Sequence, residues 1–161
     1  MPTQSITVRP ARLSDAEGMM AVINPIIELG GSTAHRTLFD VERMQNHYIA
    51  PPLIIACTIA QEGNEIIGYQ SVLFPDPDWD GPDKLPEGWA IIASFVALGQ
   101  HGKGVGQRLF SLTVDAVRAA GVGNIDATIR QENTGGQAYY EKIGFVTYRE
   151  NKQTVSKKYV V

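Results

Sequence analysis

Three glycines and a lysine stand close together in the stretch from His101 to Gly106, which reads HGKGVG. An apolar run, 89–98, precedes it and predicts a buried strand, and an amphipathic run, 105–120, follows it and predicts a helix. A strand, a glycine-rich turn and a helix in this order present several backbone N–H groups together at a helix N-terminus, and such a site attracts phosphate. The residues therefore favour a phosphate-binding turn over a plain connector without a ligand.

The spacing of these glycines does not fit two common nucleotide motifs. A P-loop needs serine or threonine directly after its Gly-Lys pair, but Lys103 is followed by Gly104, so no hydroxyl is placed to hold magnesium. A dinucleotide-binding turn needs a third glycine three residues after the second, and those positions hold Gln107 and Leu109. The phosphate would therefore belong to another kind of ligand.

The composition bounds the class of protein. The chain has 161 residues, 43% of them hydrophobic and 19% charged, which suits one globular domain with a sizeable core. The formal charge of -3 argues against a nucleic-acid partner. The single cysteine, Cys57, excludes an internal disulfide and a cysteine-based metal cluster, and its apolar surroundings favour a buried strand residue over a nucleophile. No metal site is expected.

Targeting signals are not evident in the sequence. Residues 1–5 lack the basic region and apolar core of a secretory signal, and no apolar run approaches the roughly 20 residues of a membrane span. These features predict a cytoplasmic protein without a membrane partner.

Hydrophobic periodicity predicts one α/β domain over residues 1–161, in the order β-α-α-β-β-β-α-β-α-β-β around a central mixed sheet. The expected strands are 5–10, 53–60, 65–74, 91–98, 124–129, 145–148 and 155–161, and the expected helices are 14–27, 40–48, 105–120 and 135–143.

Three local signals refine this prediction. Ser14 and Glu17 have the spacing of a capping box, which would start the first helix at Ser14, and Pro25 should kink or end that helix. Gly68 inside an apolar strand predicts a bulge or a close approach of another element.

Residues 75–88 are expected to form a long loop, because they hold four prolines and five acids around Trp79. The acidic part, Asp76 to Glu87, would attract a cationic amine, although a solvated loop or a dimer contact is the more ordinary reading.

Two motifs together resemble the GNAT superfamily of acyl-CoA-dependent N-acetyltransferases. The first, 96–106, is similar to the family's strand-ending valine followed by Arg/Gln-x-x-Gly-x-Gly/Ala, except that His101 stands where arginine or glutamine is usual. The second, 133–145, matches the family's asparagine, a tyrosine seven residues later, and Gly-Phe. The order of elements also agrees over nearly the whole chain.

The resemblance implies a single-domain GNAT-like fold with a mostly antiparallel sheet of about seven strands, about four flanking helices, and a splay between strands four and five. It also implies acetyl-CoA as co-substrate, with the pantetheine arm lying in the splay and the pyrophosphate on the glycine turn. The implied CoA-binding residues are Ser94, Phe95, Val96, His101, Gly102, Lys103, Gly104, Val105, Gly106, Gln107 and Asn133.

The chemistry implied by the resemblance is direct attack of an amine on the thioester through a tetrahedral intermediate. Tyr140 matches the family's general acid, which protonates the leaving thiolate, whereas the adjacent Tyr139 should face elsewhere. The base is open: Glu28, His35 and Glu87 are loop or helix-end candidates, the side of the sheet that Asp126 faces is uncertain, and a water chain is a further option.

The acceptor is expected to be a small-molecule amine. Within residues 26–36, which shape acceptor pockets in the superfamily, Glu28, Thr33, His35 and Arg36 are the candidate contacts. The general pattern resembles the phosphinothricin acetyltransferase-like branch, whose acceptors are amino-acid-like, and Arg36 would pair with an acceptor carboxylate.

Two other interpretations of the function stay open: a non-catalytic acyl-CoA-binding or sensing module on the same fold, and a different nucleotide ligand. A homodimer is the expected assembly.

Overall fold

A computed structural model describes residues 5–161. Residues 1–4, which belong to the stretch without a secretory signal, lie outside the described residues. Residues 5–161 form seven strands and four α-helices in the predicted order. The strands are β1 (Ile6–Pro10), β2 (Ile54–Glu62), β3 (Glu65–Leu73), β4 (Trp89–Val96), β5 (Asn124–Arg130), β6 (Val146–Glu150) and β7 (Thr154–Val160). The helices are α1 (Ala16–Leu29), α2 (Val41–Met44), α3 (Val105–Ala119) and α4 (Thr134–Lys142).

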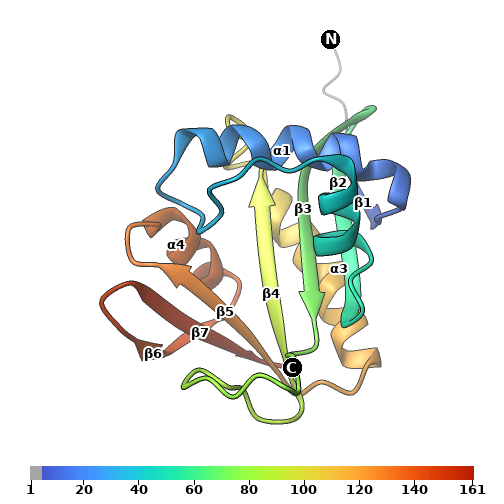
Figure 1. The fold of residues 1–161 in the computed structure, drawn as a ribbon. Coiled ribbons are helices and arrows are strands. Elements are labelled where there is room, and N and C mark those ends of the chain that lie inside the picture. The colour runs from blue at the N-terminus through green and yellow to red at the C-terminus, as the bar shows by residue number, and fades with distance from the viewer. Residues whose placement is uncertain (1–4) are drawn as a thin grey trace.

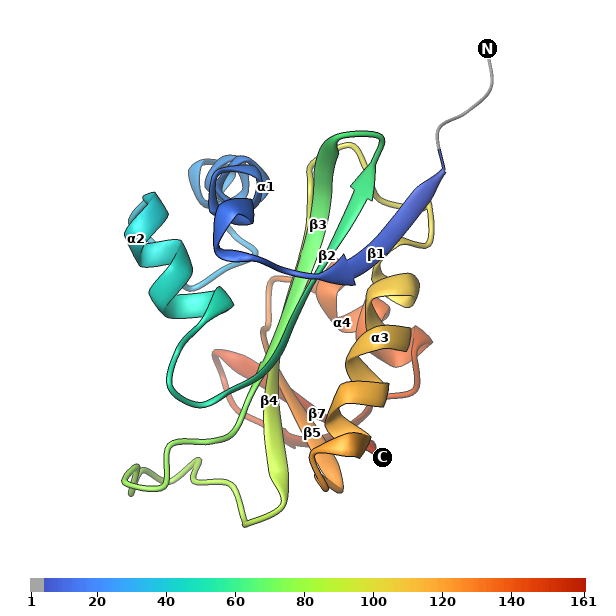
Figure 2. The same ribbon diagram turned by 90° about the vertical axis from the view of Figure 1, so that its right-hand side faces the viewer.

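All strands join one mixed sheet in the order β1-β2-β3-β4-β5-β7-β6, in which only the β4–β5 pair is parallel (Figure 1). Helices α1 and α2 cover one face of the sheet, and α3 and α4 lie on the other (Figure 2). The predicted fold class is therefore confirmed. Among residues 5–161, no helix is long and apolar enough to cross a membrane.

The β4–β5 pairing is short. It extends from Trp89 opposite Asn124 to Ile91 opposite Asp126, after which both strands continue without pairing to each other. The strands diverge beyond this point (Figure 1). We refer to the interval beyond Ile91 and Asp126 as the splay, and its presence agrees with the prediction.

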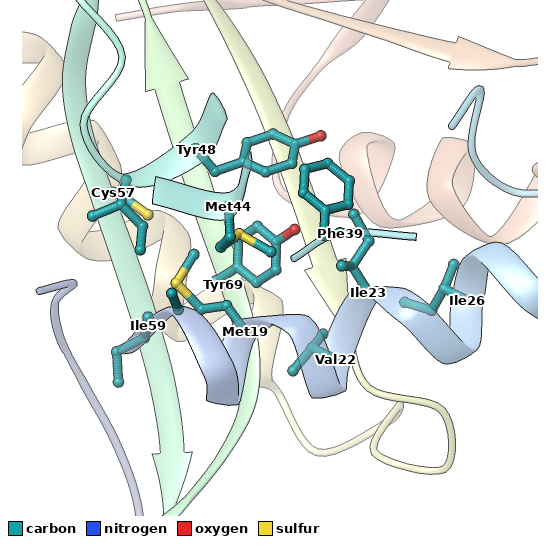
Figure 3. Packing of buried hydrophobic residues seen from close by; sticks show 12 residues of the cluster. Met19, Val22, Ile23, Ile26, Phe39, Met44, Tyr48, Cys57, Ile59 and Tyr69 are labelled. Atoms are coloured by element: carbon teal, nitrogen blue, oxygen red, sulfur yellow. The ribbon is translucent and has the colours of Figure 1, made fainter. Parts of the chain in front are cut away.

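Hydrophobic clusters on both faces hold the sheet in this shape. Met19 and Ile23 of α1 pack with Met44, Ile59 and Tyr69 on one face (Figure 3). On the other face, α3 and α4 pack on β5 through a second cluster made of Phe110, Val117, Ile125, Ala127, Tyr140 and Phe145, among others. Each face of the sheet therefore has its own apolar core, and the second cluster includes residues of both β4 and β5.

The start of α1 differs from the prediction. Asp15 closes a 3₁₀ turn ahead of α1, because its Oδ2 accepts the Arg12 backbone N–H at 2.7 Å and its carboxylate pairs with Arg9 at 2.9 Å. Asp15 is also the N-cap residue of α1, but its side chain makes no capping hydrogen bond to that helix. Leu13–Asp15 form a 3₁₀ turn and α1 begins at Ala16. The helix continues past Pro25 to Leu29, so Pro25 does not end it, and the alternative expectation of a kink stays a prediction.

The second helical segment and the long loop follow the sequence signals. Asp40 caps α2 through its side chain, and Gln45–Ile49 continue as a π turn. Residues 75–88 form neither helix nor strand.

Gly68 is a point of close approach, as predicted. A Cβ at this position would lie 3.0 Å from Cγ1 of Val105 and 3.1 Å from the Phe95 carbonyl oxygen. The missing side chain therefore seats the first residue of α3 directly on β3, next to the glycine turn.

Candidate functional site

The main chain of β4 offers hydrogen-bonding groups to the splay. The N–H of Ala97 donates to the carbonyl of Ile67 on β3 at 2.9 Å. Because N–H and C=O directions alternate along a strand, Phe95 also faces β3, whereas Ser94 and Val96 face the splay. Of the three residues predicted to offer main-chain groups to a ligand here, Ser94 and Val96 have the right direction and Phe95 does not.

The glycine turn lies between the end of β4 and the start of α3. Gly102 and Gly104 have φ values of +81° and +76°, a region that side chains other than glycine rarely adopt. Within residues 5–161, no hydrogen-bond acceptor occurs for the backbone N–H groups of residues 101–107. The turn therefore combines unpaired donors with the positive end of the α3 dipole, which is the arrangement that binds phosphate.

The cationic side chains near the turn are already engaged. Lys103 Nζ contacts Gln100 Oε1 at 2.7 Å and Glu62 Oε2 at 3.8 Å. Arg108 donates from Nη1 to the Ile6 carbonyl on β1. His101 is exposed on the turn. The attraction for a phosphate therefore comes mainly from backbone N–H groups.

Tyr140 and Ser94 meet on the α3/α4 side of the splay. The Tyr140 hydroxyl donates to Ser94 Oγ at 2.8 Å, and Tyr140 is only 6% exposed. Burial raises the pKa of the Tyr140 hydroxyl well above its ordinary value, with Tyr139 adding to the rise. Tyr140 therefore stays protonated at neutral pH.

Two further residues complete this network, and the sequence reasoning missed both. Gln70 on β3 donates from Nε2 to Ser94 Oγ at 2.8 Å and to the Tyr139 hydroxyl at 3.0 Å. The Tyr139 hydroxyl donates to the Gly106 carbonyl at 2.8 Å, so the expectation that Tyr139 faces elsewhere was wrong. The signal for Gln70 was available, because it is a polar residue inside an apolar strand.

Gln70 keeps one polar atom unsatisfied. Its side chain is fully buried, and Oε1 has no hydrogen-bond partner among residues 5–161. An orphaned buried acceptor is costly, and in a native protein it commonly marks a place where a ligand or water supplies the missing donor.

Asn133 caps α4 and also contacts the segment between α1 and α2. Its Oδ1 accepts from the Gly136 N–H at 2.9 Å, and its Nδ2 donates to the Ser32 carbonyl at 3.1 Å. Ser32 lies in the segment between α1 and α2, so this contact ties that segment to α4.

The predicted acceptor residues occupy this same segment but do not form one cluster. Thr33 is buried and accepts the His35 backbone N–H, and His35 Nε2 contacts the Tyr48 hydroxyl at 2.7 Å. Burial lowers the pKa of His35, so its ring is neutral at neutral pH. Arg36 is exposed, and so is Glu28 at the end of α1.

The candidate bases are distributed over different elements. Glu28 and Glu87 are both exposed and make no ion pair with any residue in the range 5–161. Asp126 is 4% exposed and accepts from the Tyr148 and Thr128 hydroxyls. Its pKa is raised, because burial outweighs the two hydrogen bonds. In the described part of the chain, no group of three or more His, Cys, Asp or Glu could hold a metal ion.

A sequence profile described as the acetyltransferase (GNAT) family matches residues 28–145, which include the splay, the glycine turn and Tyr140. The chain belongs to this family. A comparison with curated proteins found no match.

Solved structures share the GNAT fold of this chain at low sequence identity. The GNAT domain of PAT from S. lividans superimposes with a TM-score of 0.78 at 17% identity, covering 96% of this chain and 89% of that one. The acetyltransferase yncA from Salmonella typhimurium, solved with acetyl-CoA, gives 0.74 at 17% identity over 96% and 93%. A phosphinothricin acetyltransferase from Sinorhizobium meliloti, also solved with acetyl-CoA, gives 0.75 at 17% identity over 97% and 88%.

Proposed function

We propose that this GNAT protein transfers an acetyl group from acetyl-CoA to the primary amine of a small molecule, with an amino-acid-like acceptor favoured. Two neighbouring features together carry the proposal. The backbone N–H groups of residues 101–107 are unpaired, and the Tyr140 hydroxyl is held on Ser94 beside the splay. Two of the similar structures contain acetyl-CoA, which supports the same donor here.

The residues present fit the parts of acetyl-CoA. The N–H groups of the glycine turn suit the pyrophosphate, and the splay-facing main chain of Ser94 and Val96 suits the amide-bearing pantetheine arm. Gln70 Oε1 is an unsatisfied acceptor that suits a donor from the same arm. Acetyl-CoA would supply an activated thioester, and these residues would hold it in the splay.

Different residues of the chain have different roles in the proposed reaction. An N–H from the Ser94 or Val96 main chain stabilises negative charge that develops on the carbonyl oxygen. The amine nitrogen forms a bond to the acetyl carbon and the carbon–sulfur bond breaks. Tyr140 donates its proton to the sulfur, and the proton lost by the amine nitrogen balances it, so that the products are the N-acetyl compound and CoA.

Thiol release from acetyl-CoA, measured with a panel of amines, tests the function directly. We expect turnover with at least one amino-acid-like amine. Binding of acetyl-CoA without turnover on any amine would favour instead the acyl-CoA-binding or sensing module.

Thermal unfolding separates acetyl-CoA from other nucleotides, because a ligand that binds the native state raises the melting temperature. We expect stabilisation by acetyl-CoA or CoA. Stabilisation by ATP or NAD and not by acetyl-CoA would overturn the donor assignment. A homodimer and a cytoplasmic location stay predictions from the sequence.

A further inference from the structure

The loop between β3 and β4 forms one wall of a cleft of about 320 Å³. The residues that line it include Trp79 from this loop, Ile91 on β4, Asp126 and Thr128 on β5, and Arg149 on β6. We refer to this space as the loop cleft. Its volume suits a small molecule of about amino-acid size.

The loop cleft lies at the closed end of the splay. Asp126 and Ile91 are the last paired residues of β5 and β4, and both line the cleft. Ile125 and Ala127 pack against the α3/α4 cluster, so Asp126 faces the opposite side of the sheet because side chains alternate along a strand.

Tyr140 approaches the splay from the other face. It contacts Ser94, three residues beyond Ile91, or about 10 Å along β4 at about 3.3 Å per residue. A thioester held between the strands therefore has the loop cleft on one side and the proton donor on the other. An acceptor in the cleft is on the correct side to attack while the sulfur leaves toward Tyr140.

Among the charged residues of the cleft, Asp126 and Arg149 do not pair with each other. Asp126 accepts from the Tyr148 hydroxyl at 2.5 Å and from Thr128 Oγ1 at 2.9 Å, and no cation of residues 5–161 forms an ion pair with it. A carboxylate has about four lone-pair sites, so Asp126 keeps acceptor capacity for a ligand.

Arg149 is the available cation. Its guanidinium contacts Ser156 Oγ at 3.5 Å and lies 5.5 Å from the Tyr148 ring centroid, and it has no carboxylate partner in the described chain. Lys84, the other cation of the cleft, is already paired with Asp80 at 3.6 Å. A free guanidinium beside apolar surface is suited to bind a carboxylate through two parallel hydrogen bonds.

We propose that the loop cleft is the acceptor site and that it takes a small amine that also carries a carboxylate. Asp126 faces the amino group and receives its proton, Arg149 binds the carboxylate, and Trp79 and Ile91 contact an apolar side chain. This inference rests on the proposed function. It replaces the segment 26–36 as the main source of acceptor contacts, and it gives the acidic loop a role in substrate binding.

Amino acids and their decarboxylated amines together test whether Arg149 binds the carboxylate of the acceptor. L-Leucine, L-methionine and L-phenylalanine are compared with their decarboxylated amines, using wild type and Arg149→Met. We expect Arg149→Met to raise KM for the amino acids by about 10- to 100-fold, as for loss of a charged hydrogen bond, and to leave KM for the decarboxylated amines unchanged. Arg118→Met, on the exposed face of α3, is the control that should change neither value. Equal KM values for Arg149→Met and wild type on every amino acid would overturn the assignment of Arg149.

Asp126→Asn tests the amine end. We expect kcat/KM to fall by about 100-fold or more, as for loss of a general base, with the acetyl-CoA dissociation constant unchanged. Asp115→Asn, an exposed carboxylate on α3, is the matched control. Wild-type kcat/KM in Asp126→Asn would overturn its role. If Asp126→Asn does not fold, Thr128→Val, at an exposed position, removes one support of the carboxylate and should lower kcat/KM in the same direction.

A binding measurement separates this inference from the proposed function. Titration calorimetry of the three amino acids into the CoA complex reports acceptor binding without turnover. Binding that is lost in Arg149→Met would support the cleft even if no acetyl transfer occurred. Turnover on amino acids that is insensitive to both Arg149→Met and Asp126→Asn would keep the proposed function and overturn the cleft.

Discussion

The hydroxyl of Tyr140 lies 2.8 Å from Ser94 Oγ, and this single contact joins α4 to β4 across the face of the splay. Ser94 Oγ also accepts from Gln70 Nε2 at 2.8 Å. Two donors therefore point at one serine oxygen. This arrangement holds the Tyr140 hydroxyl at the face of the splay, where we propose that it protonates the leaving sulfur.

Tyr140→Phe removes the donor and keeps the ring that packs on Phe145. We expect kcat to fall by about 100-fold or more, as for loss of a general acid, while the acetyl-CoA dissociation constant stays near wild type. Steady-state kinetics and calorimetry measure the two quantities. Tyr159→Phe is the matched control, because this ring also packs on Phe145 but belongs to β7. Equal kcat values for Tyr140→Phe and wild type would show that another group protonates the sulfur.

Gly104 and Gly121 form a natural pair for testing the glycine turn. Their φ values are +76° and +77°, so alanine imposes a similar backbone strain of about 1–2 kcal/mol at either position. Gly104 lies in the glycine turn at the start of α3, whereas Gly121 follows the other end of that helix. We expect both variants to lose melting temperature, and only Gly104→Ala to bind acetyl-CoA more weakly. The same acetyl-CoA affinity in both variants would contradict the proposal that the glycine turn binds the pyrophosphate.

Gly106 and Gly135 test how closely α3 approaches Tyr139. A Cβ on Gly106 would lie 2.3 Å from Cε1 of Tyr139, whereas a Cβ on Gly135 would have its nearest neighbour at 4.0 Å. We expect Gly106→Ala to displace the Tyr139 ring, lower the melting temperature and reduce kcat, because Tyr139 shares Gln70 with Ser94. Gly135→Ala should be neutral or stabilise α4 by about 0.5–1 kcal/mol. Thermal unfolding and kinetics of the two variants give the comparison.

The sequence predicted much of the fold because the relevant signals are local. Alternation and helical periodicity identify the strands and helices, and Gly68 marked a real close approach to Val105. The start of α1 was misplaced because Arg9, which pairs with Asp15, comes from the preceding strand. Such a tertiary partner outweighs the capping preference of Ser14.

The chemistry of the site was only partly predictable. Tyr140 was found through its register in a motif, but Gln70 and Tyr139 join the same network through contacts between residues far apart in sequence. The sequence also left open which side of the sheet the Asp126 side chain faces, for a similar reason. It depends on which neighbours of β5 pack against α3 and α4, and only the assembled sheet places Ile125 and Ala127 there.

The pair of Arg9 and Asp15 predicts how stability depends on pH. The hydrogen bond from Arg9 is the largest cause that lowers the pKa of Asp15 in the folded protein, and the Arg12 N–H acts in the same direction. The ionised carboxylate is therefore favoured by folding. This contribution is fully present above the ordinary aspartate pKa of about 3.9, and it is lost as the pH falls through the lower pKa of the folded state.

Asp15→Asn tests this dependence. We expect the variant to be less stable than wild type at pH 7 by about 1–3 kcal/mol, because a charged hydrogen bond is lost at a mostly buried site. The difference should shrink as the pH is lowered from about 4 toward 2, since wild-type Asp15 then becomes protonated and neutral as well. Asp115→Asn is the control, because its pair with Arg118 is exposed and contributes about 0–1 kcal/mol. Urea unfolding at several pH values measures the free energies. A difference between wild type and Asp15→Asn that stays constant over this range would mean that the carboxylate stabilises the start of α1 by its shape and not by its charge.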